Sequence, residues 1–172
     1  MPRHTDVYAI VVLLATALTL PVAQAQNEEA LKQFVGKWQN ASLSFTGDGR
    51  FSRDLPEQVE VKQPDRNTIE FSVKPKVTDE PVFHIRLTYD ITSKSYLLDV
   101  RSHETRDYPS VLEKVKLTYT QGAGFSGEGM LTGPSGKSQP VKVQIAPKQD
   151  GWTLQATGNG LDFSIGFFER IK

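Results

Sequence analysis

Phe83-His-Ile-Arg-Leu-Thr-Tyr-Asp-Ile-Thr-Ser-Lys-Ser-Tyr-Leu-Leu-Asp-Val-Arg101 decides the fold, because it contains two alternating apolar and polar stretches joined by a polar turn. Placing Tyr89 opposite Tyr96 aligns the apolar residues of both stretches on one face. The same register places Arg86 opposite Asp99 on the other face, a favourable cross-strand pair. Because one register satisfies both faces, the segment predicts an antiparallel β-hairpin with one buried face.

The same period of two extends from residue 36 to the C-terminus. It predicts further strands, and the less regular ones are expected at 37–46, 57–62, 68–74, 113–120 and 124–132. Two more hairpins are expected near the C-terminus, with Ile145 facing Trp152 and Leu154 facing Phe163. Ahead of the strands, residues 27–35 predict a short helix that Asn27 caps and Gly36 ends.

About ten strands joined mostly by short turns must bury their apolar faces together. The exceptions are the longer expected connections at 47–56 and 102–112. We therefore expect an all-β fold, an antiparallel up-and-down β-barrel of about 8–10 strands with a short N-terminal helix. A two-sheet sandwich is the alternative, but short connections favour a barrel, which leaves no edge strand.

Composition excludes several classes of protein. A chain of 172 residues allows one domain, and 20 basic against 20 acidic residues argue against a nucleic-acid partner. The absence of cysteine excludes a disulfide framework, a cysteine-ligated metal site and a cysteine nucleophile. It also excludes a bacterial lipoprotein, which needs a cysteine to carry the lipid.

The N-terminus has the three-part pattern of a secretory signal peptide. A polar start precedes an apolar run that ends before Pro21, and Ala23-Gln-Ala25 supplies the small residues of a cleavage site. We expect residues 1–25 to be removed and residues 26–172 to form a single β-barrel domain without stable membrane insertion. An uncleaved anchor is the alternative. An exported chain without disulfides favours the periplasm, with secretion as the other possible destination.

The segment Phe34-Val-Gly-Lys-Trp38, a short helix followed by Gly-x-Trp at the first strand, resembles the start of the calycin barrels. That group includes lipocalins, fatty-acid-binding proteins and lipocalin-like domains of bacterial exported proteins. The resemblance implies that a basic residue of the last strand packs over the Trp. It therefore assigns Gly36, Trp38 and Arg170 to one structural motif, and a guanidinium over an indole is favourable in itself.

The barrel interior is the main functional candidate, because barrels of this size can enclose one small ligand. A filled core without a cavity is the alternative, and the inward-facing glycines Gly127 and Gly129 either leave room or allow close packing. Tyrosines in the inward set could orient the polar end of a ligand, or their hydroxyls could lie in water at the barrel mouth. The candidate ligand-binding residues are Phe45, Phe71, Phe83, Tyr89, Tyr96, Leu98, Tyr119, Val143, Trp152 and Phe163.

No catalytic or metal-binding constellation is visible in the sequence. His84 is expected on the outer face and His103 in a loop, and neither belongs to a cluster with metal-ligand spacing. The sequence thus predicts an exported, non-catalytic protein that binds a small apolar or amphipathic molecule without a cofactor. A structural or protein-interaction module with a filled core, such as an inhibitor or envelope accessory protein, is the alternative, and an enzyme ranks third.

Overall fold

The structure is a computed structural model that describes residues 27–46, 51–74, 83–102, 111–133, 136–160 and 162–171. Backbone alone is described at 40–46, 51–57, 74, 102, 111 and 168. The described residues form one helix at 27–32, the N-terminal helix, and ten strands. The strands are β1 (Gly36–Thr46), β2 (Phe51–Asp65), β3 (Thr68–Lys74), β4 (Phe83–Asp90), β5 (Ser95–Ser102), β6 (Val111–Thr120), β7 (Gly124–Thr132), β8 (Ser138–Lys148), β9 (Gly151–Gly158) and β10 (Asp162–Ile171).

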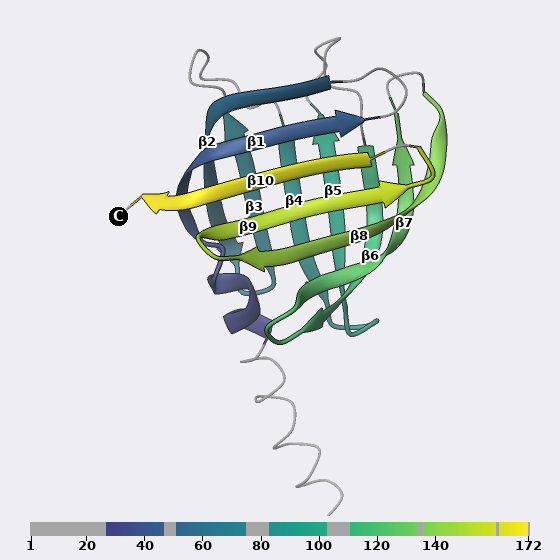
Figure 1. The fold of residues 1–172 in the computed structure, drawn as a ribbon. Coiled ribbons are helices and arrows are strands. Elements are labelled where there is room, and N and C mark those ends of the chain that lie inside the picture. The colour runs from purple at the N-terminus through teal and green to yellow at the C-terminus, as the bar shows by residue number, and fades with distance from the viewer. Residues whose placement is uncertain are drawn as a thin grey trace, which may run out of the picture.

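The strands form a closed antiparallel barrel in which each strand pairs with its neighbours in sequence (Figure 1). β1 pairs with both β2 and β10, and this pairing closes the ring. In Figure 1, β1, β2 and β8 to β10 cross the front of the barrel at a steep angle to the strands behind them. The predicted all-β up-and-down barrel is therefore confirmed.

The direction of the chain alternates from strand to strand, so every second turn lies at the same end of the barrel. The turns after β2, β4, β6 and β8 share this end with the N-terminal helix, which covers it (Figure 1). We call it the helix end. These four turns are short and comprise residues 66–67, 91–94, 121–123 and 149–150.

The β4–β5 hairpin has the predicted register at every pair. Arg86 lies opposite Asp99 as expected, but its Nε atom approaches a carboxylate oxygen of Glu70 on β3, at 3.5 Å. Asp99 instead accepts a hydrogen bond from the backbone N–H of Lys114 on β6. The alignment was thus predictable, whereas the ion pair depends on the neighbouring strands.

The registers predicted for the two C-terminal hairpins were wrong by two residues. Ile145 pairs with Leu154 rather than with Trp152, and Leu154 pairs on its other side with Ile165 rather than with Phe163. The β8–β9 turn contains only two residues, which extends the pairing toward it. A shift of two leaves every side chain on its predicted face, so alternation alone could not reveal the error.

Several predicted boundaries also move. The helix ends at residue 32 and a turn follows it at 33–34, so the predicted span of 27–35 was too long. β2 begins at Phe51 and ends at Asp65, whereas the sequence predicted 57–62 as strand and 47–56 as connection. β6 begins at Val111, inside the connection predicted at 102–112.

The interior is packed with apolar side chains from all around the ring. The largest fully buried side chains are Phe34, Phe83, Phe125, Phe163, Phe167, Leu31, Ile69, Leu87, Leu98, Leu112 and Leu117. Phe83 on β4 and Phe163 on β10 meet across the interior with ring centroids 6.0 Å apart. Burial of this set supplies the main stabilisation of the fold, at about 25 cal/mol per Å² of apolar surface.

Two inward glycines on β7 allow the neighbouring strand to pack closely. A Cβ atom at Gly129 would lie 2.5 Å from Cγ2 of Val115, and one at Gly127 would lie 2.1 Å from the backbone oxygen of Lys116. These positions therefore serve close packing against β6, and aliphatic and backbone atoms occupy the space that a side chain would need.

Candidate functional site

Residues from both ends of the chain anchor the N-terminal helix to the barrel. The Trp38 indole N–H donates a hydrogen bond to the backbone oxygen of Phe34 at 2.8 Å. Arg170 on β10 donates to the backbone oxygen of Val35, and its guanidinium carbon lies 5.7 Å from the centre of the Trp38 ring. Gly36 belongs to this arrangement, because its φ is +141° and a Cβ atom there would lie 3.0 Å from Nε of Arg170.

Phe34 is the residue by which the helix segment enters the barrel. Its ring centroid lies 4.2 Å from that of Trp152, 5.7 Å from that of Phe71 and 5.8 Å from that of Phe125. Contacts of this kind between tilted and edge-on rings are favourable. The aromatic side chain of Phe34 therefore fills the helix end of the interior from below, and we call it the Phe34 plug.

Three tyrosines lie at the same end, beside the plug. The ring of Tyr96 lies 5.1 Å from that of Tyr89 and 6.4 Å from that of Tyr119, measured between centroids. Tyr96 and Tyr119 also contact Phe125, at 4.7 Å and 4.8 Å. Tyr96 is buried, whereas Tyr89 and Tyr119 are half-buried and keep part of their rings exposed.

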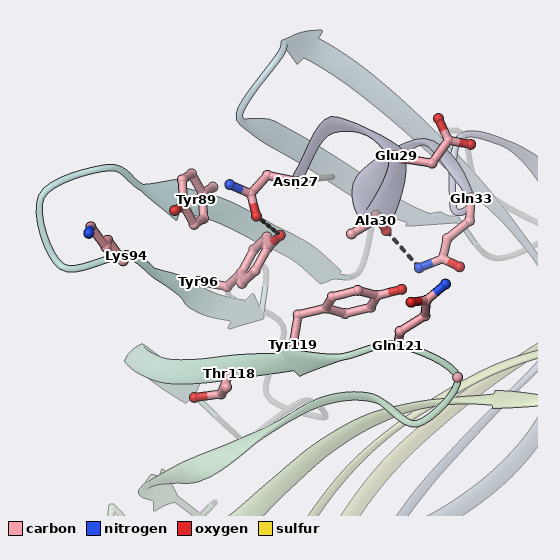
Figure 2. Close-up of a pocket in the computed structure, with 11 residues that line it drawn as sticks. Asn27, Glu29, Ala30, Gln33, Tyr89, Lys94, Tyr96, Thr118, Tyr119 and Gln121 are labelled. Carbon is pink, nitrogen blue, oxygen red and sulfur yellow. Dashed lines mark hydrogen bonds between the residues drawn. The ribbon is translucent and has the colours of Figure 1, made fainter. Parts of the chain in front are cut away.

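A pocket of about 680 Å³ opens between these tyrosines and the helix (Figure 2). We call it the tyrosine pocket. Its volume lies within the range of about 300–1,000 Å³ that is usual for small-molecule sites. The N-terminal helix, the β4–β5 hairpin and the β6–β7 hairpin contribute the lining, which comprises Asn27, Glu29, Ala30, Gln33, Tyr89, Lys94, Tyr96, Thr118, Tyr119, Gln121 and Gly122.

Two hydrogen bonds order the polar groups of the pocket. The Tyr96 hydroxyl donates to Oδ1 of Asn27 at 2.8 Å, and Nε2 of Gln33 donates to the backbone oxygen of Ala30 at 2.7 Å. Burial raises the pKa of Tyr96 well above the usual range of a phenol, and nearby Tyr89 adds to this effect. Tyr96 therefore remains a neutral donor at physiological pH.

The turn beneath the pocket is also held by side-chain hydrogen bonds. The Asp90 carboxylate accepts hydrogen bonds from the Ser93 hydroxyl at 2.6 Å and from the backbone N–H groups of Thr92 and Ser93. These bonds lower the pKa of Asp90. The turn brings Lys94, with a φ of +50°, to the margin of the pocket.

Nine of the ten predicted ligand-binding residues divide into two groups. Tyr89, Tyr96 and Tyr119 line the tyrosine pocket. The side chains of Phe71, Phe83, Leu98, Val143, Trp152 and Phe163 are buried in the core. Phe45 pairs with Phe163 in the β1–β10 register, and its side chain lies outside the described part.

Sequence reasoning did not identify the three side-chain amides of the pocket, at Asn27, Gln33 and Gln121. Asn27 was interpreted only as a helix cap, and it is 69 residues from Tyr96 along the chain. The topology could have found them, because an up-and-down barrel places the entering helix and every second turn at one end. The predicted helix at 27–35 and the predicted turn after 113–120 both belong to that end, which was a usable signal.

Other chemistry is limited among the described residues. No cluster of three or more His, Asp or Glu side chains is arranged to hold a metal ion there. His84 is exposed on the outer face, as predicted, and His103 lies outside the described ranges, as do residues 1–26 with the expected signal peptide. No helix in the described part has the length and apolar character needed to span a membrane.

Comparison with known proteins gives no relative. The chain matches no family model, no curated protein and no solved structure. The class of protein is therefore defined by its architecture, an all-antiparallel barrel compatible with the calycin type.

Proposed function

We propose that the protein is an exported, non-catalytic calycin-type barrel that binds a small apolar or amphipathic molecule. One observation carries the proposal: the tyrosine pocket has the volume of a ligand site and combines half-buried aromatic rings with ordered polar groups. Rings supply apolar contact area, and a few fixed polar groups supply orientation. The contact between Trp38 and Arg170 supports the resemblance to lipocalin-like domains.

The location of the pocket modifies the initial expectation of a ligand deep in the barrel. The Phe34 plug occupies the interior at the helix end, where its ring contacts Trp152 and Phe71. A ligand at this end would therefore lie between the helix and the rims of two hairpins, with its apolar part against Tyr89 and Tyr119. Ala30 offers a further apolar surface on the helix side.

Native mass spectrometry of the purified protein tests ligand binding directly. We expect a co-purifying adduct that is lost from the Tyr119→Ala variant, because that substitution removes an aromatic wall of the pocket. Thr120→Ala is the matched control, since Thr120 is exposed on the same strand and does not line the pocket. An adduct that survives Tyr119→Ala, or a protein that binds neither a co-purifying molecule nor an added amphipathic probe, would contradict the proposal.

The alternative function is a structural or protein-interaction module, and the packed core favours it. Phe34, Leu98 and Phe125 are all 0 % exposed, so solvent does not reach the interior around them. Such a barrel would present its outer surface to a partner. Retention of a purified bacterial envelope protein by the immobilised barrel, undiminished by Tyr119→Ala, would favour this function over small-molecule binding.

Export is part of the proposal. The signal-peptide pattern of residues 1–25 supports cleavage before Gln26 and release into the periplasm or the medium without a lipid anchor. Expression of the full chain in a Gram-negative host, followed by mass measurement of the periplasmic product, should give a polypeptide that begins at Gln26. Retention of the full-length chain in the membrane fraction would contradict it.

A further inference from the structure

The centre of the tyrosine pocket is uncharged. Three amides and three phenols line it, whereas the charged lining residues, Glu29 and Lys94, lie on opposite margins in Figure 2. Thr118 projects from the other side of its strand, away from the helix. A charged ligand group at the centre would therefore have no opposite charge facing it from the central residues, which makes its desolvation costly.

The two hydrogen bonds of the pocket give its amides opposite polarity. Oδ1 of Asn27 accepts from Tyr96, which leaves the Asn27 amide nitrogen to present donors. Nε2 of Gln33 donates to the oxygen of Ala30, which leaves the Gln33 side-chain oxygen to present an acceptor. Gln121, two residues beyond Tyr119 in the turn after β6, can supply either kind of group.

This combination fits one class of chemical group best. A hydroxyl group donates and accepts, so the several hydroxyls of one ligand can pair with donors such as the Asn27 amide nitrogen and with acceptors such as the Gln33 side-chain oxygen. A purely apolar ligand would leave these amides without partners, which costs about 1–3 kcal/mol for each group that becomes buried. The half-buried side chains of Tyr89 and Tyr119, which line the pocket, offer aromatic surface for the C–H groups of the same ligand.

We infer that the tyrosine pocket binds the neutral, hydroxyl-rich head group of an amphipathic molecule, a sugar-like ring, through Asn27, Gln33 and Gln121. The inference rests on the proposed function and specifies its ligand class. The head group lies between the helix and the β6–β7 turn, and its apolar substituent extends along Tyr89 and Tyr119. Glu29 and Lys94 remain at the margins.

Three probes with one tail and different head groups test the inference. We would titrate the mature protein with n-octyl β-D-glucoside, octanoate and n-octyltrimethylammonium, each below its micelle concentration, and follow amide chemical shifts by NMR. The glucoside should bind at least about tenfold more tightly than either charged probe. Its shifts should include the side-chain amides of Asn27, Gln33 and Gln121.

A matched pair of variants locates the binding. Gln121→Ala should weaken glucoside binding about three- to tenfold, the effect of losing one neutral hydrogen bond. Gln149→Ala is the control, because Gln149 is exposed in another turn of the helix end and does not line the pocket. Both substitutions lie in turns of the barrel. Unchanged amide chemical shifts of the core residues show that a variant is folded, which separates a binding defect from a folding defect.

The outcomes distinguish an error in the head-group class from an absence of small-molecule binding. Tighter binding of octanoate or of the ammonium probe at the same pocket overturns the head-group assignment and leaves small-molecule binding standing. Glucoside binding that Gln121→Ala and Gln149→Ala leave equally strong overturns the assignment too. Failure of all three probes to shift any pocket residue overturns both proposals.

Discussion

The Phe34 plug allows a quantitative test of how the helix end is held together. Phe34 is 0 % exposed and its ring lies against Trp152, Phe71 and Phe125, so Phe34→Ala removes a buried ring and leaves a cavity. Substitutions of this kind cost about 3–5 kcal/mol of folding free energy. The ring contacts between aromatic side chains place the expected loss in the middle of that range, about 4 kcal/mol.

Urea unfolding followed by tryptophan fluorescence measures this loss. With a denaturant dependence of about 2 kcal/mol per M, a loss of about 4 kcal/mol lowers the unfolding midpoint by about 2 M. Trp152 is a suitable reporter because its ring centroid lies 4.2 Å from that of Phe34. Lys32→Ala, in the helix that precedes Phe34, is the control, since Lys32 is exposed, and its midpoint should stay near that of the unsubstituted protein.

Two results would contradict the role of the Phe34 ring in the core. A loss below about 1 kcal/mol for Phe34→Ala would mean that the ring does not support the core. A large loss of stability in Phe34→Ala without binding of benzene to that variant would contradict the enclosed position of the Phe34 ring, because an enclosed apolar cavity of ring size binds such a molecule. Benzene should therefore stabilise Phe34→Ala and leave Lys32→Ala unchanged.

Four further expected outcomes concern Tyr96, Asp90 and Gly129. Tyr96→Phe removes the hydrogen bond to Asn27 and should lower the free energy of unfolding by about 1 kcal/mol in thermal or urea unfolding. Because the pKa of Tyr96 is raised in the folded state, the unfolded chain releases this proton first, so stability should fall as pH rises above about 10, and less steeply in Tyr96→Phe. The pKa of the Asp90 carboxyl is lowered on folding from its ordinary value of 3.8. The ionised carboxylate therefore stabilises the fold above pH 3.8, and this contribution is lost as the pH falls through the pKa of the folded state. Asp90→Asn should reduce this acid dependence in unfolding curves. Gly129→Ala should cost about 1–3 kcal/mol by urea unfolding, because its Cβ atom would lie 2.5 Å from Val115.

Tyr89→Phe and Ser126→Ala are the matched controls for Tyr96→Phe and Gly129→Ala. Tyr89→Phe keeps the Tyr96 hydrogen bond, so an equal loss of stability in Tyr89→Phe would remove the role given to Tyr96. An unchanged acid midpoint in Asp90→Asn would contradict the role of the turn. Ser126→Ala alters an exposed position on the same strand as Gly129, and equal midpoints in these two variants would disprove the close packing.

The sequence predicted the pairing register correctly where the residues on both faces of a strand constrained it. In the β4–β5 hairpin, opposite charges on one face and apolar residues on the other agree on a single register, and the structure has it. In the β8–β9 hairpin only the apolar face was informative, so a shift of two residues fitted equally well until the short turn selected Ile145 and Leu154 as partners.

The candidate site was predictable in part. The alternation identified Tyr89, Tyr96 and Tyr119 as inward-facing, because all three continue apolar faces of their strands. Alternation by itself could not identify Asn27 or Gln33 as their neighbours; the up-and-down topology placed the helix at the same end of the barrel but did not give the contact between Asn27 and Tyr96. Polar contacts between segments distant in sequence leave no local pattern, whereas burial of a strand face does.

The pairing of β1 with β10 has a consequence for how the chain folds. Val35 and Arg170, which are 135 residues apart, form a hydrogen bond beside the strands that close the ring. Contacts between such distant segments carry a large loop-closure cost and slow the folding of a domain. Until β10 is available, β1 has an unpaired edge and the Trp38 ring lacks its guanidinium partner. The chain therefore completes its barrel only after its last strand is present.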